Sequence, residues 1–206
     1  MAETSLATTR REAVAAGRQL GFPLAAKVVS PDIVHKSDVG GVRLSIENAV
    51  DLGRAYDGIM AAVGERRPGA RIAGLAVQKM TPPGIEVIVG MFTDPQFGPV
   101  LMFGLGGIWT EVLEDVSFRV VPITRADAGS MVAEIRGYRV LKGGRGREPG
   151  NMEALERFLL DVSRFIVKNP EIREMDLNPV LLCRDEVVAV DARMVLEGAP
   201  GSQLGN

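Results

Sequence analysis

The only histidine of the chain, His35, lies in a polar stretch that ends at Gly40 and Gly41. An imidazole nitrogen is a nucleophile that can hold a phosphoryl group transiently, and a loop can carry that group between two sites. A histidine that is simply exposed at the surface, or that only binds phosphate, is the alternative interpretation. The two glycines let backbone N–H groups approach phosphate oxygens, although a tight hairpin turn also explains them.

Oxygen-bearing side chains gather near the end of the chain. Asp176 and Asn178 are two residues apart, so on a strand they share one face. If residues 183–186 form a four-residue hairpin loop, the register brings Asn178 opposite Asp191, with Cβ atoms about 4.5–5.5 Å apart. Three oxygen ligands then converge, as Mg²⁺ requires when it bridges nucleotide phosphates. A pair of solvated acids is the alternative.

Other residues typical of phosphate and sugar binding interrupt or follow apolar segments. Lys27 interrupts the apolar run 24–29, where a buried ammonium is costly unless an anion such as ATP phosphate pairs with it. A half-exposed strand with Lys27 on its outer face is the alternative. Gly106 and Gly107 belong to a second glycine-rich loop, which lacks Walker-A spacing. Glu86, in a strand of Ile and Val, suits hydrogen bonds to ribose hydroxyls or a solvated strand face.

Hydrophobic periodicity and turn residues predict the elements that position these side chains. The expected helices cover residues 9–20, with a capping box at Thr9 and Glu12, then 48–63, 124–136 and 152–166. The expected strands cover 24–29, 42–46, 72–80, 85–93, 100–103, 118–123, 175–182 and 187–194. Because helices and strands do not alternate regularly, we predict an α+β fold with antiparallel sheets rather than a doubly wound parallel sheet.

Composition and charge exclude several classes of protein. The 206 residues carry a net charge of -2, which gives no electrostatic basis for binding nucleic acid or an acidic membrane. A single cysteine, Cys183, cannot form an internal disulfide and fits a reducing compartment. No apolar run reaches the roughly 20 residues that span a bilayer, and no signal peptide is evident. We therefore expect a cytoplasmic protein that binds neither nucleic acid nor a membrane.

Four stretches of the chain resemble one family in the same order. They are residues 27–42, 83–90, 94–108 and 176–179, the last followed by Asp191, Ala192 and Arg193. They closely resemble the ATP-grasp domain of ADP-forming (NDP-forming) acyl-CoA synthetases, within the succinyl-CoA synthetase superfamily. The similarity covers about residues 20–197.

This resemblance implies a fold and an activity. It implies two lobes, approximately 1–78 and 79–197, whose antiparallel sheets clasp ATP or ADP with Mg²⁺, and a tail at 198–206. The implied enzyme is an acid–thiol ligase that converts an acid, CoA and ATP to acyl-CoA, ADP and phosphate. Such enzymes pass the phosphoryl group through histidines, and His35 lies inside the matching motif.

The resemblance also implies roles for single residues. Lys27 matches the lysine that contacts nucleotide phosphates in ATP-grasp proteins, and Gly106 and Gly107 lie close to the phosphate path. Asp176 stands where relatives often have Glu, so its contact with a metal would be indirect. At the hinge between lobes, backbone carbonyls meet the adenine amino group. The residues matching that hinge are Gln78, Lys79 and Met80.

A partner is implied as well. Family members usually have about 20 further N-terminal residues, a CoA-binding domain and a ligase-type domain, on the same chain or on an alpha subunit. We therefore expect this chain to be inactive in acyl-CoA formation without that partner, and a homo- or hetero-oligomer is compatible with this. The acid substrate and the choice of ATP or GTP stay open.

Two other interpretations remain. The chain could be a nucleotide-binding regulatory or interaction domain without turnover, in a fusion of a synthetase-like region with an acyltransferase. It could also be an ATP-grasp carboxylate ligase of another type, in which nucleotide binding is indifferent to His35. Stabilisation by MgATP or MgADP would argue against a silent domain, since a ligand that binds only the folded state raises its apparent stability.

Overall fold

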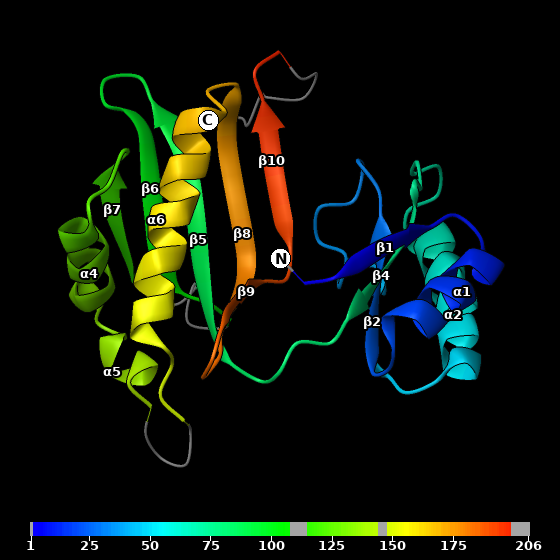
Figure 1. The fold of residues 1–206 in the computed structure, drawn as a ribbon. Coiled ribbons are helices and arrows are strands. Elements are labelled where there is room, and N and C mark those ends of the chain that lie inside the picture. The colour runs from blue at the N-terminus through cyan, green and yellow to red at the C-terminus, as the bar shows by residue number, and fades with distance from the viewer. Residues whose placement is uncertain (1, 108–114, 144–147, 199–206) are drawn as a thin grey trace. The chain divides into compact units, whose positions relative to one another are not determined.

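The computed structural model describes residues 2–107, 115–143 and 148–198 (Figure 1). The chain divides into two compact units, an N-terminal unit, Ala2–Thr81, and a C-terminal unit that starts at Pro82. Each unit is a sheet with helices packed on one face, and every strand pair among the described residues is antiparallel. The predicted α+β class with antiparallel sheets is therefore confirmed.

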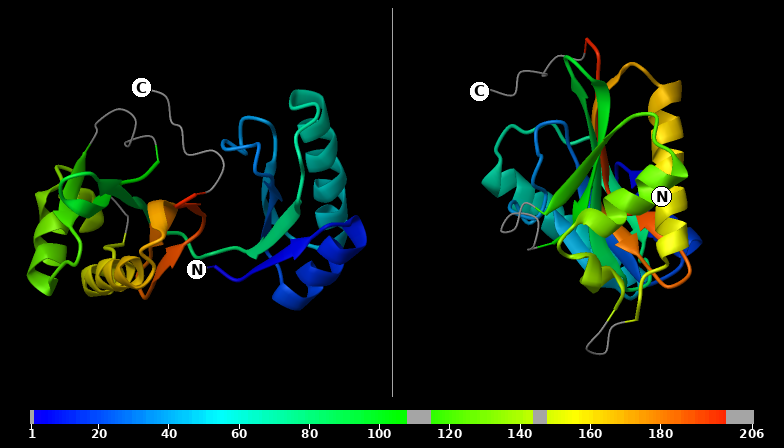
Figure 2. Two further views of the ribbon diagram at one scale, coloured as in Figure 1. Left: turned by 90° about the horizontal axis from the view of Figure 1, so that it is seen from above. Right: turned by 90° about the vertical axis from the view of Figure 1, so that its left-hand side faces the viewer.

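The N-terminal unit has a four-stranded sheet covered by two helices. The sheet order is β1 (Thr4–Ala7), β4 (Gly74–Lys79), β2 (Leu24–Val29) and β3 (Val42–Ile46). The helices α1 (Arg10–Leu20) and α2 (Ala49–Arg66) pack side by side on one face (Figure 2). Alternate residues of β2 enter the core under these helices, which includes Leu24, Ala26, Val28, Leu52, Ile59 and Val63.

Both helices of this unit begin where their caps predict. The Thr9 side chain accepts the Glu12 backbone N–H while the Glu12 carboxylate accepts the Thr9 N–H, which completes the predicted capping box of α1. Asn48 caps α2 by accepting the N–H groups of Val50 and Asp51, both at 3.0 Å. Local side-chain chemistry thus fixes where each helix starts.

The C-terminal unit is built on a larger sheet. Its strands are β5 (Ile85–Asp94), β6 (Gly98–Leu105), β7 (Val116–Val120), β8 (Ile172–Leu182), β9 (Val187–Ala189) and β10 (Ala192–Leu196), in the order β10-β8-β5-β6-β7 with β9 beside β8. Its helices are α4 (Arg125–Glu134), α5 (Tyr138–Leu141) and α6 (Met152–Lys168). Figure 1 shows α6 lying along the sheet and α4 beside β7. Alternation in β5 buries Val87, Val89 and Met91 beneath these helices.

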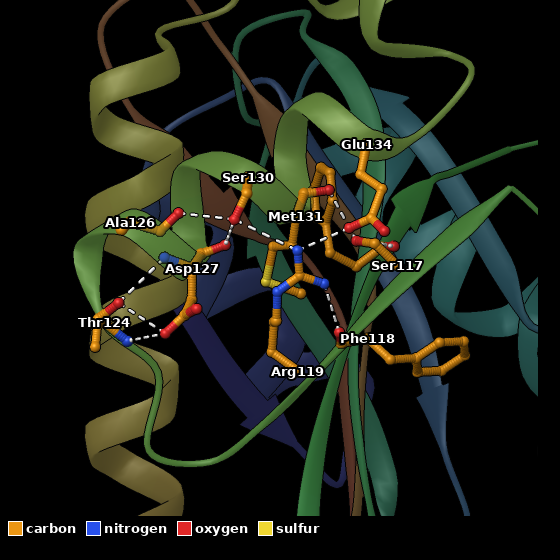
Figure 3. Close-up of polar contacts among 10 residues, drawn as sticks. Ser117, Phe118, Arg119, Thr124, Ala126, Asp127, Ser130, Met131 and Glu134 are labelled. Carbon is orange, nitrogen blue, oxygen red and sulfur yellow. Dashed lines mark hydrogen bonds and ion pairs between the residues drawn. The ribbon is translucent and has the colours of Figure 1, made fainter.

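Polar contacts tie β7 to α4 (Figure 3). The Ser117 hydroxyl donates to the Met131 carbonyl at 2.8 Å, and Arg119 Nη2 lies 2.8 Å from the Glu134 carboxylate. Asp115 is 7% exposed, and its carboxylate accepts the backbone N–H groups of Arg136 at 2.7 Å and Gly137 at 2.6 Å. This buried acid therefore holds the turn that follows α4.

Two short elements, β1 and α5, were not predicted. β1 is a four-residue edge strand whose partners in β4 lie about 70 residues away, so its own sequence carries little signal. α5 is a single turn of four residues. No helix among the described residues has both the length and the apolar character needed to cross a bilayer.

Candidate functional site

His35 lies on an exposed loop of the N-terminal unit, residues 30–41, between β2 and β3. Two apolar side chains of this loop, Ile33 and Val39, are each 5% exposed and join the core beneath α1 and α2. His35, between them, is exposed. The loop is thus anchored on both sides of the histidine, and the imidazole is presented to solvent rather than packed in the core.

The end of this loop closes against β2 through its two glycines. The Gly41 N–H donates to the Lys36 carbonyl at 2.8 Å, and the Val28 N–H donates to the Gly41 carbonyl at 2.8 Å. A Cβ on Gly41 would lie 2.5 Å from Val28 Cγ1, and Gly40 has a φ of +69°. Both glycines therefore have a packing or conformational reason to be there. Their role as phosphate contacts stays a prediction.

Two arginines five residues apart, Arg66 and Arg71, contact the loop. Arg71 donates to the Asp32 carboxylate from its backbone N–H at 2.8 Å, from Nε at 3.0 Å and from Nη2 at 2.7 Å. These hydrogen bonds from Arg71 lower the pKa of Asp32 to about 2. Arg66 Nη1 donates to the Asp38 carbonyl at 3.0 Å. Sequence reasoning missed these contacts because they depend on tertiary packing.

Lys27 lies in β2, one of the two inner strands of the sheet, on the face away from the helices. Its neighbours Ala26 and Val28 are fully buried on the helix side, while Lys27 is half-buried. Lys27 is opposite Val42 of β3 and Ala76 of β4. Lys27 therefore lies on the half-exposed face of the strand, as the alternative interpretation expected, and its contact with phosphate stays a prediction.

The three predicted hinge residues end β4 on the same sheet. Gln78 is 5% exposed, and its Nε2 donates to the Thr4 hydroxyl at 3.0 Å. Lys79 is exposed, and the Met80 N–H donates to the Pro23 carbonyl at 3.2 Å. The Gln78 side chain therefore has a structural partner within the sheet, and its contact with adenine stays a prediction.

The hairpin of β8 with β9 and β10 has the predicted register. Leu182 is opposite Val187, as a four-residue loop requires, and the same register continues to Leu177 opposite Ala192. Between these pairs, the Asn178 N–H donates to the Asp191 carbonyl at 3.2 Å. The predicted pairing of Asn178 with Asp191 is confirmed.

Asp176 lies on the same strand face as Asn178. Both are exposed, while Met175 and Leu177 are buried on the helix side. The carboxyl of Asp176 is nevertheless partly desolvated, which raises its pKa. The Arg193 guanidinium opposite it acts in the other direction, and the Asp191 carboxylate raises the pKa further. The two acids are thus close enough to repel each other.

This donor set fits a hard divalent cation. Two carboxylates and an amide from one hairpin offer oxygen atoms, which Mg²⁺ prefers, and a cation would relieve the repulsion between the acids. Within 2–107, 115–143 and 148–198, no three His, Cys, Asp or Glu side chains are grouped so that they could hold a metal ion, so the set depends on the Asn178 amide. Metal binding by these residues stays a prediction.

A cavity of about 940 Å³ lies at the carboxyl end of β8, within the C-terminal unit. Three predicted nucleotide contacts line it, Glu86, Gly106 and Gly107. The Gly106 N–H donates to the Glu86 carbonyl at 2.8 Å, and a Cβ on Gly106 would lie 2.9 Å from the Glu86 carbonyl carbon. The loop packs against β5 this closely because Gly106 has no side chain.

The hairpin loop supplies another wall of the cavity, which sequence reasoning missed. Cys183 is 5% exposed, and burial raises the pKa of its thiol, with smaller contributions from Glu186 and Asp185. At the rim, Arg184 and Glu148 form an ion pair at 3.4 Å. A cavity of this size is typical of small-molecule sites.

Comparison with known proteins identifies the family. A protein-family model described as "ATP-grasp domain" matches residues 1–196. The beta subunit of acetate–CoA ligase [ADP-forming] I from Pyrococcus furiosus is 47% identical over 94% of this chain and 84% of that subunit. The chain belongs to the ATP-grasp family. The family resemblance and the ATP-grasp fold expected from the sequence are confirmed, and this ATP-grasp domain corresponds to the beta-type component of ADP-forming ligases.

A longer relative and a solved structure support the same family assignment. Acetate–CoA ligase [ADP-forming] I from Archaeoglobus fulgidus is 53% identical over 86% of this chain, but the ATP-grasp domain spans only 26% of that protein. The dinucleotide forming acetyl-coenzyme A synthetase 1 of Ca. Korarchaeum cryptofilum, in complex with coenzyme A, Ca-AMPCP and HgCl⁺, aligns with a TM-score of 0.93 and 46% identity, covering 95% of this chain and 86% of that one.

A second structure of the Korarchaeum protein holds coenzyme A and Mg-AMPPCP. Its phosphohistidine segment points towards the nucleotide binding site. It aligns with a TM-score of 0.82 and 43% identity, covering 95% of this chain and 84% of that one.

Proposed function

We propose that this ATP-grasp domain is the nucleotide-handling component of an ADP-forming acyl-CoA ligase, and that His35 carries the phosphoryl group. The observation that carries the proposal is the His35 loop, in which an exposed imidazole stands between two buried anchors, Ile33 and Val39. The loop closes onto Val28, the residue next to Lys27. The phosphohistidine segment of the Korarchaeum protein supports the same chemistry.

The first step is phosphoryl transfer to His35. A ring nitrogen of His35 attacks the γ-phosphorus of ATP, the bond between that phosphorus and the bridging oxygen breaks, and its electron pair leaves with ADP. Lys27 contributes positive charge to the phosphate tail, which favours a transition state with charge spread over phosphate oxygens. The backbone N–H groups of Gly40 and Gly41 contribute close polar contacts.

The second step moves the phosphoryl group from His35 to the acid. A carboxylate oxygen attacks the phosphorus, the nitrogen–phosphorus bond breaks, and the imidazole regains its electron pair. The CoA sulfur then attacks the acyl carbon of the acyl phosphate and phosphate leaves. These later steps belong to a CoA-binding, ligase-type partner subunit or domain, and the lengths of the relatives support such a partner.

Each unit has residues for which this proposal gives a role in nucleotide binding. Glu86 and the Gly106–Gly107 loop line the cavity that would receive the sugar end. Asp176, Asn178 and Asp191 would hold Mg²⁺, which when bound neutralises charge on the phosphates. The backbone of the β4 end would receive the adenine amino group, through Gln78, Lys79 and Met80.

The test is a labelling experiment with the purified chain and Mg-ATP carrying ³²P in the γ position. The wild-type chain should acquire a label that is lost in acid and stable in base, as expected of a phosphohistidine. His35→Asn should lose it. Ser37→Ala, a change in the same loop that removes no imidazole, should keep it.

Three results have distinct meanings. A label that survives in His35→Asn would refute the relay. Nucleotide binding without any label in the wild-type chain would favour a carboxylate ligase that does not use phosphohistidine. The absence of thermal stabilisation by MgATP and MgADP would favour a domain without turnover.

A further inference from the structure

Arg193 has no part in the chemistry above, although it lies among the residues proposed to hold the metal. It is on β10, directly opposite Asp176 of the neighbouring strand β8 (Figure 1). Directly opposed residues of an antiparallel pair project to the same face of the sheet. Asp191 precedes Arg193 by two residues and faces Asn178, so it shares that face. The hairpin therefore brings a guanidinium and three oxygen-bearing side chains together on one face of the C-terminal unit.

We infer that Arg193 is a further nucleotide-binding residue, which is the counter-ion of Asp176 before a metal binds and contacts a phosphate oxygen of the nucleotide once the metal is bound. This inference rests on the proposed function, from which it takes the nucleotide and the divalent cation. Its two roles can be measured by binding alone, without any phosphoryl transfer.

The Arg193 guanidinium is available to a ligand. Arg193 is exposed, and within the part of the chain that the structure describes its side chain makes no hydrogen bond or ion pair. Phe92, Glu174, Asp176 and Arg193 line a hollow of about 130 Å³ on this face. A guanidinium carries five N–H donors in a planar fork that matches the geometry of phosphate. The fork therefore borders open space rather than a packed core.

The acids around Arg193 make its contact with phosphate depend on the metal. Glu174 and Asp176 border the same hollow, and their negative charge repels a phosphate group. Burial raises the pKa of the Asp176 carboxyl and the Arg193 guanidinium lowers it, so these two side chains already interact. When the Asp176 carboxylate is shared with a divalent cation, Arg193 is released from its role as counter-ion and can donate to the phosphate oxygens.

The two roles predict opposite effects of one substitution. Arg193→Met removes a positive charge beside the metal ligands, so a divalent cation alone should bind more tightly. The same change removes a charge-assisted hydrogen bond to phosphate, so the metal–nucleotide complex should bind less tightly. An arginine that only stabilises the hairpin predicts something else, since a loosened hairpin would weaken both kinds of binding.

The first experiment titrates the full chain with Mn²⁺ in the absence of nucleotide and follows free Mn²⁺ by electron paramagnetic resonance. Arg193→Met should lower the Kd for Mn²⁺ by roughly 3-fold, because the repulsion between two nearby cations is only partly screened. Arg193→Lys keeps the charge and should bind Mn²⁺ as the wild-type chain does. Arg157→Met is the matched control, since Arg157 is 65% exposed on α6, which packs on the other face of the sheet. Unchanged or weaker Mn²⁺ binding in Arg193→Met would overturn the counter-ion role.

The second experiment is a calorimetric titration of the same variants with MgADP. Arg193→Met should raise the Kd by about 10-fold, the effect of losing one hydrogen bond to a charged group. Arg193→Lys should recover less than half of this loss, because an ammonium cannot reproduce the fork. Arg157→Met should bind MgADP with wild-type affinity. Wild-type affinity in both Arg193 variants would overturn the phosphate contact.

These measurements separate the role of Arg193 from the His35 relay. If γ-labelled ATP leaves no label on the wild-type chain, the relay fails, and the MgADP titrations still decide whether Arg193 contacts the nucleotide. If the label forms and Arg193→Met binds MgADP like the wild-type chain, the proposed function stands and the inference about Arg193 fails. A wild-type chain that binds no MgADP would overturn both.

Discussion

Asn178 and Asp191 face each other across the hairpin of the C-terminal unit, joined by a backbone hydrogen bond of 3.2 Å. The register around them holds from Leu182 opposite Val187 to Glu174 opposite Val195. Directly opposed residues of an antiparallel pair project to the same side. The hairpin therefore places an amide beside a carboxylate through backbone pairing alone, before any ligand binds.

Removal of either side chain should weaken magnesium-dependent nucleotide binding. We expect Asp191→Asn and Asn178→Ala each to raise the Kd for MgATP by about 10-fold or more, a loss of roughly 1.4 kcal/mol, because an oxygen ligand or its charge is lost. Calorimetric titrations with and without Mg²⁺ measure this effect. Asp161→Asn, on the exposed surface of α6, is the control. Equal weakening in the absence of Mg²⁺ would contradict a metal role.

Substitution of Gly41 should destabilise the N-terminal unit. In Gly41→Ala the new Cβ would lie 2.5 Å from Val28 Cγ1 and 2.8 Å from the Lys36 carbonyl, and backbone cannot move aside easily. We expect a loss of about 1–3 kcal/mol in the free energy of unfolding, typical of overpacking, measured by urea denaturation.

Gly64→Ala is the control for this experiment. Gly64 is within α2 and has no atom within 4 Å of an added Cβ, so alanine should stabilise the chain by about 0.5–1 kcal/mol through helix propensity. Equal effects of the two substitutions would mean that the loop relaxes around the new methyl group.

The Asp32–Arg71 contact predicts a pH dependence at the acid end. The folded-state pKa of Asp32 is about 2, below the ordinary value of 3.8, so the contact stabilises the folded state above pH 3.8. That contribution is lost as the pH falls through about 2. Titration of the Asp32 carboxyl carbon by NMR should show the low pKa in the wild-type chain and a return towards 3.8 in Arg71→Met.

Asp127 provides an internal reference for this titration. Its pKa is lowered mainly by the Thr124 hydroxyl and backbone, with a smaller contribution from Arg119 and none from Arg71. The Asp127 pKa should therefore be the same in the wild-type chain and in Arg71→Met. A shift at both aspartates would point to general unfolding rather than to the loss of one contact.

Asp115 should be important for stability. Asp115→Ala leaves the part-buried N–H groups of Arg136 and Gly137 without their acceptor, which we expect to cost about 1–3 kcal/mol. Glu153→Ala, which breaks an exposed ion pair with Arg157 on α6, should change stability by less than about 0.5 kcal/mol. Thermal unfolding of both variants makes the comparison, and similar melting temperatures would contradict the prediction.

Sequence patterns predicted the features that local chemistry determines. The Thr9 capping box, the Asn48 cap and the hairpin register all depend on spacing, and the structure has each of them. Family motifs led to the ATP-grasp assignment, which neither composition nor periodicity could provide. The positions of Asp176 and Asn178 on one face also follow from strand alternation alone.

Sequence reasoning missed the features that depend on contacts between residues far apart along the chain. The edge strand β1 exists because β4 pairs with it, and the contacts of Arg66 and Arg71 join segments about 30 to 40 residues apart. The cavity beside Glu86 depends on the meeting of residues 82–84, the glycine loop at 106–107 and the hairpin loop at 183–186. The position of Arg193 opposite Asp176 could have been predicted from the sequence, because the same register count places these two residues opposite each other.

The bond from the Val28 N–H to the Gly41 carbonyl ties the end of the histidine loop to β2. Lys27 directly precedes Val28 on that strand, so the end of the histidine loop is attached one residue away from Lys27. A transplanted loop would therefore need β2 with it in order to keep this spacing. Evolutionary exchange of the histidine segment between proteins should accordingly involve the whole 24–46 hairpin rather than the loop alone.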